Sequence, residues 1–401
     1  MKYQKEEVKD KILTGMLYVF VFSLPLSSFL SVRLLFVATL FSLTLYTRKK
    51  ALNALANSWD LGIYLLVLAG GLIISRDLSA GLGVLETNFS FLAVPILFGA
   101  WDTLSRNWER FLTAFAMGLL AACIVCLANA LYRYVDTGNI QVFFQYDLAD
   151  IIRFHPTYLA YYLIFGITIG LYLLYYKDTD RSNWSIVVVV TVFFIVLILT
   201  GGSTAFISLL LIFSFFALKY VLEGRKRSKD LVIIMVSVML VMLFAVNSSG
   251  YWNKDLIVNN DYWERSPLWK SALSANSNPL FGVGTGNNTI VLNEWYRTHN
   301  MPEYAAESYN SHNQFIQVYL SNGIIGVICL FILMIRPLSL SLRSQTPLGI
   351  LIFFPFLVYG MNEVFLGRFQ GVVFFAVLHQ LFIALLRSGP ARTVLKAPNF
   401  A

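Results

Sequence analysis

Residues 310–314, Asn-Ser-His-Asn-Gln, place an ionisable ring where a long polar stretch gives way to a strongly apolar run. An imidazole can serve as a general base for a hydroxyl group. The apolar run, residues 315–335, is long enough to be a membrane helix and contains Gly323 and Gly326. At about 100° per residue, Gly323 returns nearly to the azimuth of His312, and Gly326 falls about 40° away. We therefore expect a smooth groove below His312 that admits a neighbouring helix or a lipid tail. A helix-packing glycine pair under an incidental histidine is the plainer interpretation.

A cationic candidate, Arg265, lies in the long polar loop 248–311. Asp261-Tyr262-Trp263-Glu264 has the spacing of a capping box, which predicts a helix beginning at Asp261. Helical periodicity then continues through Leu268, Trp269, Ala272 and Leu273. Arg265 falls in the first turn, where the helix dipole disfavours a cation unless an anion is close. Either a salt bridge to Asp261 or Glu264 satisfies it, or it is available to an anionic ligand.

Further along this loop, glycines recur at residues 282, 284 and 286, after Asn278-Pro279-Leu280. Spaced glycines can expose backbone N–H groups to phosphate. No strand is expected before them, so a dinucleotide site lacks its structural context. The pattern predicts a tight structural turn.

Other ionisable residues are expected on the same side of the membrane as the loop. Arg153 and His155 precede Pro156, and a residue before proline is disfavoured in a helix, so both side chains can lie at the rim of a cavity or anchor the chain at the membrane interface. Glu363 and Arg368 lie between the last two apolar runs and could simply pair with each other.

Composition favours an all-α polytopic membrane protein. Hydrophobic residues make up 57% of the 401-residue chain and charged residues 13%, and the mean hydropathy is +0.67. Helices satisfy every backbone polar group inside lipid. The net charge of +8 then concerns membrane orientation, and nucleic acid is not needed to explain it. The three cysteines (Cys123, Cys126 and Cys329) and His379 lie in apolar runs and are expected to be packing residues.

We predict about twelve transmembrane spans, at residues 12–30, 31–47, 60–76, 87–101, 111–133, 156–176, 183–200, 203–221, 231–247, 313–336, 346–362 and 368–387. A cytoplasmic N-terminus puts the cation-rich connections on the cytoplasmic side: Arg48-Lys49-Lys50, Arg106 with Arg110, Lys177 with Arg181, Arg225-Lys226-Arg227, and Arg336 with Arg343. The long loop and His312 then face outward. The predicted organisation is an N-terminal bundle (1–247), an outer loop with short helices (248–311) and a C-terminal group of spans with a cytoplasmic tail (312–401).

With these motifs in place, the chain resembles the superfamily of bacterial O-antigen ligases and O-antigen polymerases. The most specific match is the ligase-type pattern of His312-Asn313, nine residues, then Gly323-x-x-Gly326. The segments that follow Arg265 and Glu363 also resemble family signatures, so the clear matches cover roughly residues 260–375. One departure is Ser203, which stands in a Gly-Ser-Thr-Ala sequence where family members commonly carry an arginine. Arg153 is a candidate substitute for that arginine.

The resemblance implies an inverting glycosyltransferase of the type C kind in the bacterial inner membrane, with its active site facing the periplasm. The donor would be a glycan on undecaprenyl pyrophosphate, which is a good leaving group, so ATP, metal and other cofactors are not required. His312 would be the general base or a donor ligand, and Arg265 would stabilise charge on the departing pyrophosphate. Arg153 and Asn313 would also bind the pyrophosphate, with a supporting group of His155, Glu363, Arg368, Gly323 and Gly326.

Three functions follow in order of preference. A ligase would transfer the glycan to a sugar hydroxyl on lipid A–core, and the histidine–glycine pattern favours it. A polymerase would transfer the glycan to another lipid-linked repeat unit, and it shares the expected span pattern. A transporter or flippase of lipid-linked sugars would need charges near mid-bilayer and broken helices in paired halves, whereas most charges here lie at the ends of predicted spans.

Overall fold

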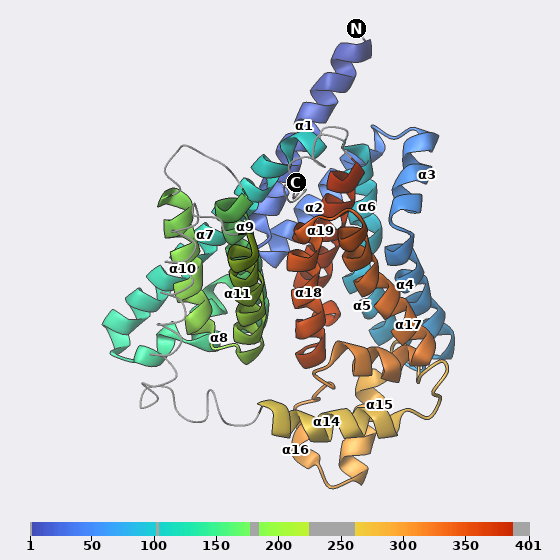
Figure 1. Cartoon of the computed structure of the whole chain (residues 1–401). Helices are drawn as coiled ribbons and strands as arrows, with labels where there is room; N and C mark the ends of the chain where they lie inside the picture. The colour runs from blue at the N-terminus through green and yellow to red at the C-terminus, as the bar shows by residue number, and fades with distance from the viewer. Residues whose placement is uncertain (1, 102–103, 177–183, 224–260, 388–401) are drawn as a thin grey trace. The chain divides into compact units, whose positions relative to one another are not determined.

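The computed structural model describes residues 2–101, 104–176, 184–223 and 261–387 (Figure 1). Within these ranges every regular element is a helix. The chain divides into two compact units, and each is described by itself: Met1–Leu17, Val32–Glu109 and Asn260–Ala401 form unit 1, and Tyr18–Ser31 and Arg110–Asn259 form unit 2.

Unit 1 contains most of the helices, including those that follow the long loop. They are α1 (Lys2–Ser23, with its end in unit 2), α2 (Ser28–Leu43, with its start in unit 2), α3 (Arg48–Asn57), α4 (Trp59–Gly70), α5 (Leu78–Asn88), α6 (Ser90–Ala100), α14 (Asp261–Ala275), α15 (Asn288–Thr298), α16 (Pro302–Ala306), α17 (Gln314–Arg343), α18 (Pro347–Asn362) and α19 (Phe369–Arg387). Short 3₁₀ turns cover Gly71–Ile74 and Phe365–Gly367.

Unit 2 is built around α9, which contacts α8, α10 and α11. Its helices are α7 (Leu104–Thr137, with its first turns in unit 1), α8 (Gln145–Ala149), α9 (Pro156–Tyr176), α10 (Trp184–Thr200) and α11 (Ser203–Glu223). Two 3₁₀ turns, Ile140–Phe143 and Asp150–Ile152, flank α8.

The helices fit an all-α membrane protein, as the composition predicts. Among the described residues, five helical stretches are long and apolar enough to cross a membrane, and a sixth is possible if the bent pair Arg48–Asn57 and Trp59–Ile74 is one span. Four shorter apolar helices, of 10–17 residues, accompany them. The total of twelve spans stays a prediction, and the expected span at 231–247 lies outside the described residues.

Several predicted span boundaries are wrong. The sequence predicts a first span at 12–30, but α1 ends at Ser23 and α2 begins at Ser28. The physical reason is Pro25, which cannot donate a helical hydrogen bond and clashes with the preceding turn. In the second unit the boundaries predicted for α9, α10 and α11 agree with the structure to within two residues.

Helix α17 is broken in the middle, contrary to the continuous helix that the sequence predicts. Gly323 has φ 61° and ψ −159°, a backbone conformation that is accessible essentially only to glycine. The amides beyond the break, of Ile324 and Ile325, donate to the carbonyls of Pro279 and Leu280 at 2.9 and 3.5 Å. The loop that carries the spaced glycines therefore supplies acceptors that the broken helix lacks.

The same loop is also a donor to the turn before the break. The amides of Val283 and Gly284 donate to the carbonyls of Leu320 and Ser321 at 2.8 and 2.9 Å. A Cβ on Gly282 would lie 2.4 Å from the backbone carbon of Ser321. The glycines thus allow two backbones to approach each other, which is the structural turn predicted from the sequence.

The groove predicted under His312 does not exist. A Cβ on Gly323 would lie 2.3 Å from the backbone of Leu280, and one on Gly326 would lie 2.5 Å from the Cβ of Asn322 in the preceding turn. The chain's own loop and the bent helix fill the space that the prediction reserved for a lipid tail. His312 and Gly326 do not share one helix face, because the break at Gly323 destroys the helical register between them.

Near its other end α17 is held by a buried ion-paired cluster. The carboxylate of Asp60 in α4 pairs with Arg336 of α17 and lies 2.8 Å from Nε2 of His379 in α19. The side chains of Asp60 and His379 are both fully buried. Arg336 also donates to the carbonyl of Asn57 at 2.9 Å and lies over the ring of Trp59. His379 is thus part of a charged cluster that joins three helices, and the expectation of simple packing is wrong.

We expect Gly323→Ala to destabilise the protein by more than about 2 kcal/mol, because the left-handed conformation and the contact with the Leu280 backbone both oppose a methyl group. Gly62→Ala in α4 is the matched control, since a Cβ there has no neighbour within 4 Å, and it should be neutral or gain up to about 1 kcal/mol. Thermal unfolding in detergent measures both. Equal melting temperatures for the two variants would contradict the proposed role of the break.

Asp60→Asn should cost about 3 kcal/mol, because it removes the counter-charge of Arg336, whose side chain is 17% exposed, and breaks the buried contact with His379. Glu7→Gln, in an exposed pair with Lys11, is the control and should leave the stability unchanged. Chemical denaturation in detergent is the measurement. Recovery of part of the loss in an Asp60→Asn/Arg336→Leu double variant would attribute the effect to the ion pair itself.

Candidate functional site

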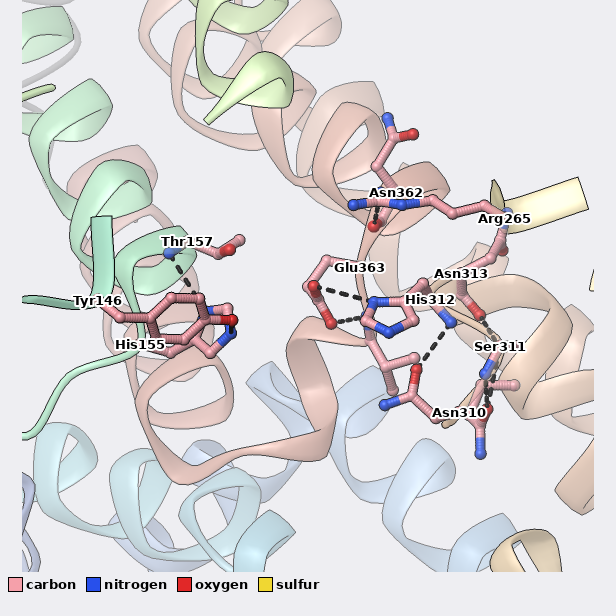
Figure 2. A network of polar contacts seen from close by, with 12 residues as sticks. Tyr146, His155, Thr157, Arg265, Asn310, Ser311, His312, Asn313, Asn362 and Glu363 are labelled. Carbon is pink, nitrogen blue, oxygen red and sulfur yellow. Dashed lines mark hydrogen bonds and ion pairs between the residues drawn. The ribbon is translucent and has the colours of Figure 1, made fainter. Parts of the chain in front are cut away.

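The C-terminal end of α18 organises the candidate site. Helix α18 ends at Asn362 because Glu363 is extended, with φ −153° and ψ 150°. The last carbonyl groups of a helix have no intrahelical donors and need partners from elsewhere. Here three consecutive residues, Met361, Asn362 and Glu363, each contact a different residue singled out from the sequence. Figure 2 shows the contacts of Asn362 and Glu363.

Asn313 contacts Met361, the first of the three residues at the end of α18. Its Nδ2 donates to the carbonyl of Met361 at 3.0 Å. Its Oδ1 accepts from the amides of Phe315 and Ile316 at 2.9 and 3.1 Å, so Asn313 is the N-cap of α17. The side chain therefore joins the start of α17 to the end of α18, which is a positioning role.

Arg265 contacts Asn362, the second of the three residues at the end of α18. Its guanidinium Nη1 donates to the carbonyl of Asn362. The C-terminal end of a helix carries a partial negative charge, which favours a cation at this position. The described part of helix α14, Asp261–Ala275, contains buried Leu268 and Ala272, which hold it against the core formed with Leu292, Tyr296, Ala305 and Leu320. The helix start expected at Asp261 stays a prediction, because residue 260 lies outside the described residues. The side chains of Asp261 and Glu264, the predicted alternative partners, lie outside the described residues.

His312 contacts Glu363, the third of the three residues at the end of α18. Its Nδ1 lies 3.5 Å from a carboxylate oxygen of Glu363, and the two side chains are 26% and 14% exposed. Its backbone is in the left-handed region with φ 44°, and its amide donates to Oδ1 of Asn310 at 2.7 Å. Residues other than glycine adopt this conformation uncommonly, although histidine does so more often than most.

The carboxylate of Glu363 defines what the imidazole can do. A carboxylate beside Nδ1 favours the tautomer with its proton on that nitrogen, which leaves the Nε2 lone pair for another group. Glu363 itself is held by its own loop, since one carboxylate oxygen accepts from the amide of Val364 at 3.0 Å. The pair can therefore take a proton from a hydroxyl placed at Nε2.

The start of α17 offers fewer free donors for phosphate than the sequence suggests. Two amides of its first turn, those of Phe315 and Ile316, already bond to Oδ1 of Asn313, and that of Gln317 donates to the Asn313 carbonyl. His312 lies one residue before the cap. Of the two roles predicted for it, the geometry favours the general base over a donor ligand that shares these amides.

Arg153 and His155 belong to unit 2. Nε2 of His155 lies 2.7 Å from the hydroxyl of Tyr146, and its Nδ1 accepts from the amide of Thr157 at 3.3 Å (Figure 2). His155 thus caps the start of α9, as its place before Pro156 suggests. Arg153 is exposed and has a left-handed φ of 54°. Its participation in a site with Arg265 stays a prediction.

The remaining predicted residues have simpler surroundings. Arg368 is exposed, and its carbonyl accepts from the amides of Gly371 and Val372 at the start of α19. Ser203 begins α11, two residues after Gly201, which has φ 68°. Among the described residues, no group of three or more His, Cys, Asp or Glu residues lies together as metal ligands.

The main-chain carbonyl groups that bind Asn313 and Arg265 could not be identified from the sequence. The carbonyls of Met361 and Asn362 carry no signature in a sequence, because every residue has one. The available signal was positional, since Glu363 directly follows an apolar run of helix length and marks its end. Ser311 and Gln317 were also missed: Gln317 Oε1 accepts from the amide and hydroxyl of Ser311 at 3.1 and 2.9 Å and so fixes the turn before α17.

The fold and the site together define a helical membrane protein with an imidazole–carboxylate pair and a guanidinium at neighbouring helix ends. Residues 186–331 match the family model described as O-antigen ligase (Wzy_C). This match supports the resemblance to the O-antigen ligase superfamily that the motifs carry. The matched range contains Arg265, His312, Gly323 and Gly326. No curated protein matches the chain. The family covers ligases and polymerases, which supports a membrane enzyme that acts on lipid-linked glycans.

We expect Asn313→Ala to destabilise the protein by about 1–2 kcal/mol through loss of the helix cap. Asn313→Ser keeps an oxygen that can cap the helix and loses the donation to the Met361 carbonyl, so its loss should be smaller. Thermal unfolding of both variants in detergent tests this order. A larger loss for Asn313→Ser would show that the contact between α17 and α18 outweighs the cap.

Proposed function

We propose that the protein is an O-antigen ligase that transfers a glycan from undecaprenyl pyrophosphate to a sugar hydroxyl of lipid A–core. The observation that carries the proposal is the convergence of His312 and Arg265 on two adjacent residues, Glu363 and Asn362. A base for an acceptor and a cation for an anionic leaving group must lie close together in any such transfer.

In the proposed reaction, Nε2 of His312 accepts the proton of the acceptor hydroxyl. The hydroxyl oxygen attacks the anomeric carbon of the donor glycan at the same time. The bond from that carbon to the pyrophosphate oxygen breaks, and the pyrophosphate departs with the electron pair. Attack from the face opposite the leaving group inverts the anomeric configuration. Glu363 stabilises the imidazolium that forms, because an opposite charge at this distance favours the protonated ring.

Arg265 is the proposed electrophilic partner. A guanidinium presents several N–H donors in one plane, which matches the oxygens of a pyrophosphate. Its Nη1 donates to the Asn362 carbonyl, and this contact orients the guanidinium. Arg153 is proposed as a second cation in place of the arginine that Ser203 replaces, and Arg368 as an exposed supporting cation.

The proposed setting is the bacterial inner membrane, with the site on the periplasmic side. The alternation of cation-rich connections in the sequence supports this orientation. Donor and acceptor are both lipid-anchored, so a site at the ends of membrane helices lies at the depth where their sugars emerge. The polymerase reaction uses the same donor and the same chemistry with a different acceptor.

Reconstituted transfer tests the proposal directly. His312→Ala should lower the transfer rate by about 10²–10⁴-fold, the usual contribution of a positioned general base. Arg265→Lys keeps the charge and loses the planar fork, and it should lower the rate by at least about tenfold. His299→Ala and Arg297→Ala, exposed residues of the same outer segment, are matched controls. Full activity in a membrane-inserted His312→Ala variant would refute the assigned role.

A deletion strain separates the two family reactions. A ligase predicts loss of long glycan from lipid A–core and accumulation of lipid-linked polymer. A polymerase predicts single repeat units on lipid A–core. Complementation with the His312→Ala and His299→Ala variants then shows whether the cellular phenotype depends on the same imidazole.

A further inference from the structure

An exposed tyrosine beside His312 has no part in the reaction as described so far. Tyr309 lies three residues before His312, with its ring centroid 5.9 Å from the imidazole and the two planes at 50°. It is 41% exposed although it belongs to a segment with many internal contacts. A large aromatic side chain held open next to a candidate base is a surface for a ligand.

The backbone of Tyr309 is fixed on both sides. Its amide donates to the carbonyl of Tyr304 at 3.1 Å, and its carbonyl accepts from the hydroxyl of Tyr296 at 3.3 Å. Tyr296 is fully buried in the core of α14–α16, and burial, aided by neighbouring Tyr304, raises its pKa to about 12. The hydroxyl therefore stays protonated at neutral pH and remains a donor.

The ring of Tyr309 is fixed as well. It packs edge-to-face on Tyr304, with centroids 5.7 Å apart and planes at 87°, and Tyr304 packs in the same way on Tyr296 at 5.7 Å. Three tyrosines thus lead from the buried core to the imidazole, and the exposed member is the one next to His312. A ring that is already fixed by its neighbours loses little conformational entropy when a ligand binds to it.

We propose that Tyr309, backed by Tyr304, is the platform for the sugar ring that carries the acceptor hydroxyl. This rests on the proposed function, because the acceptor oxygen must come within hydrogen-bond distance of Nε2 of His312. A sugar held there extends over the neighbouring side chains. One face of a hexopyranose presents polarised C–H groups, which suit the electron-rich face of an aromatic ring. The phenol hydroxyl can also bond to a ring substituent.

The donor's pyrophosphate has a different partner. It requires cations, which Arg265 supplies, and a phenol ring offers it nothing of comparable strength. The platform therefore binds the acceptor. We expect substitutions of Tyr309 to weaken acceptor binding and to leave donor binding unchanged.

Saturation-transfer NMR on the full-length protein in detergent micelles tests the platform without any reaction. The probes are a core oligosaccharide released from lipid A and a soluble repeat-unit oligosaccharide. We expect one of them to receive saturation on the C–H groups of a terminal sugar. Tyr309→Ala should abolish the transfer and Tyr309→Phe should retain it. Tyr132→Ala, at a tyrosine that is 74% exposed on α7, is the control and should change nothing.

Steady-state kinetics adds a readout that a merely structural residue would not give. Tyr309→Ala should raise the acceptor KM by about fivefold to tenfold, the range of a good aromatic contact, and leave the donor KM unchanged. Tyr309→Phe should stay within about twofold of the wild type, since it keeps the ring. An equal rise in both KM values would overturn the platform and point to a displaced loop.

The two proposals can fail separately. If the wild-type protein binds neither oligosaccharide, or if Tyr309→Ala binds as well as the wild type, the platform is wrong whatever the transfer assay shows. If an oligosaccharide binds through Tyr309 but no glycan is transferred from the lipid-linked donor, the platform stands and the proposed function is wrong. Preference for one probe over the other identifies the acceptor as lipid A–core or a repeat unit.

Discussion

The end of α18 is the constraint on which the candidate site depends. A helix that ends in an apolar setting leaves carbonyl groups in need of donors, and here Asn313 and Arg265 supply them. Because these donors come from α17 and α14, the termination of one helix fixes the relative positions of three. The residue just past the end, Glu363, then faces the residue just before the start of α17, His312. A requirement of backbone hydrogen bonding thus brings an imidazole, a carboxylate and a guanidinium to one helix end.

The position of α17 is fixed at three points along its length. Asn313 holds its start, the break at Gly323 exchanges backbone hydrogen bonds with the loop that follows α14, and Arg336 pairs with buried Asp60 near its other end. The break matters because the loop from Pro279 to Gly284 is the continuation of α14, which carries Arg265. The sequence predicts a groove for a lipid tail at Gly323. In the structure this glycine instead joins the two segments that carry the guanidinium and the imidazole.

Sequence reasoning succeeded where the information is local. The turn at 282–286 follows from its spaced glycines, and the apolar helices follow from composition. It failed where one segment acts on another. The groove below His312 assumed an unbroken helix, and His379 was expected to pack among apolar neighbours, whereas it faces Asp60 from a helix more than 300 residues away in the chain.

The sequence by itself determined the class of the protein, because hydropathy, charge asymmetry and the histidine–glycine motif are properties of residue types and their spacing. It also named Arg265, His312 and Glu363 as candidates. Only the tertiary structure decided that these three meet at the end of α18, since their common partners include main-chain carbonyls that no residue type reveals. It also decided that Tyr309 lies beside the imidazole with its ring exposed, because that position depends on the packing of Tyr296 and Tyr304 in a core assembled from separate helices.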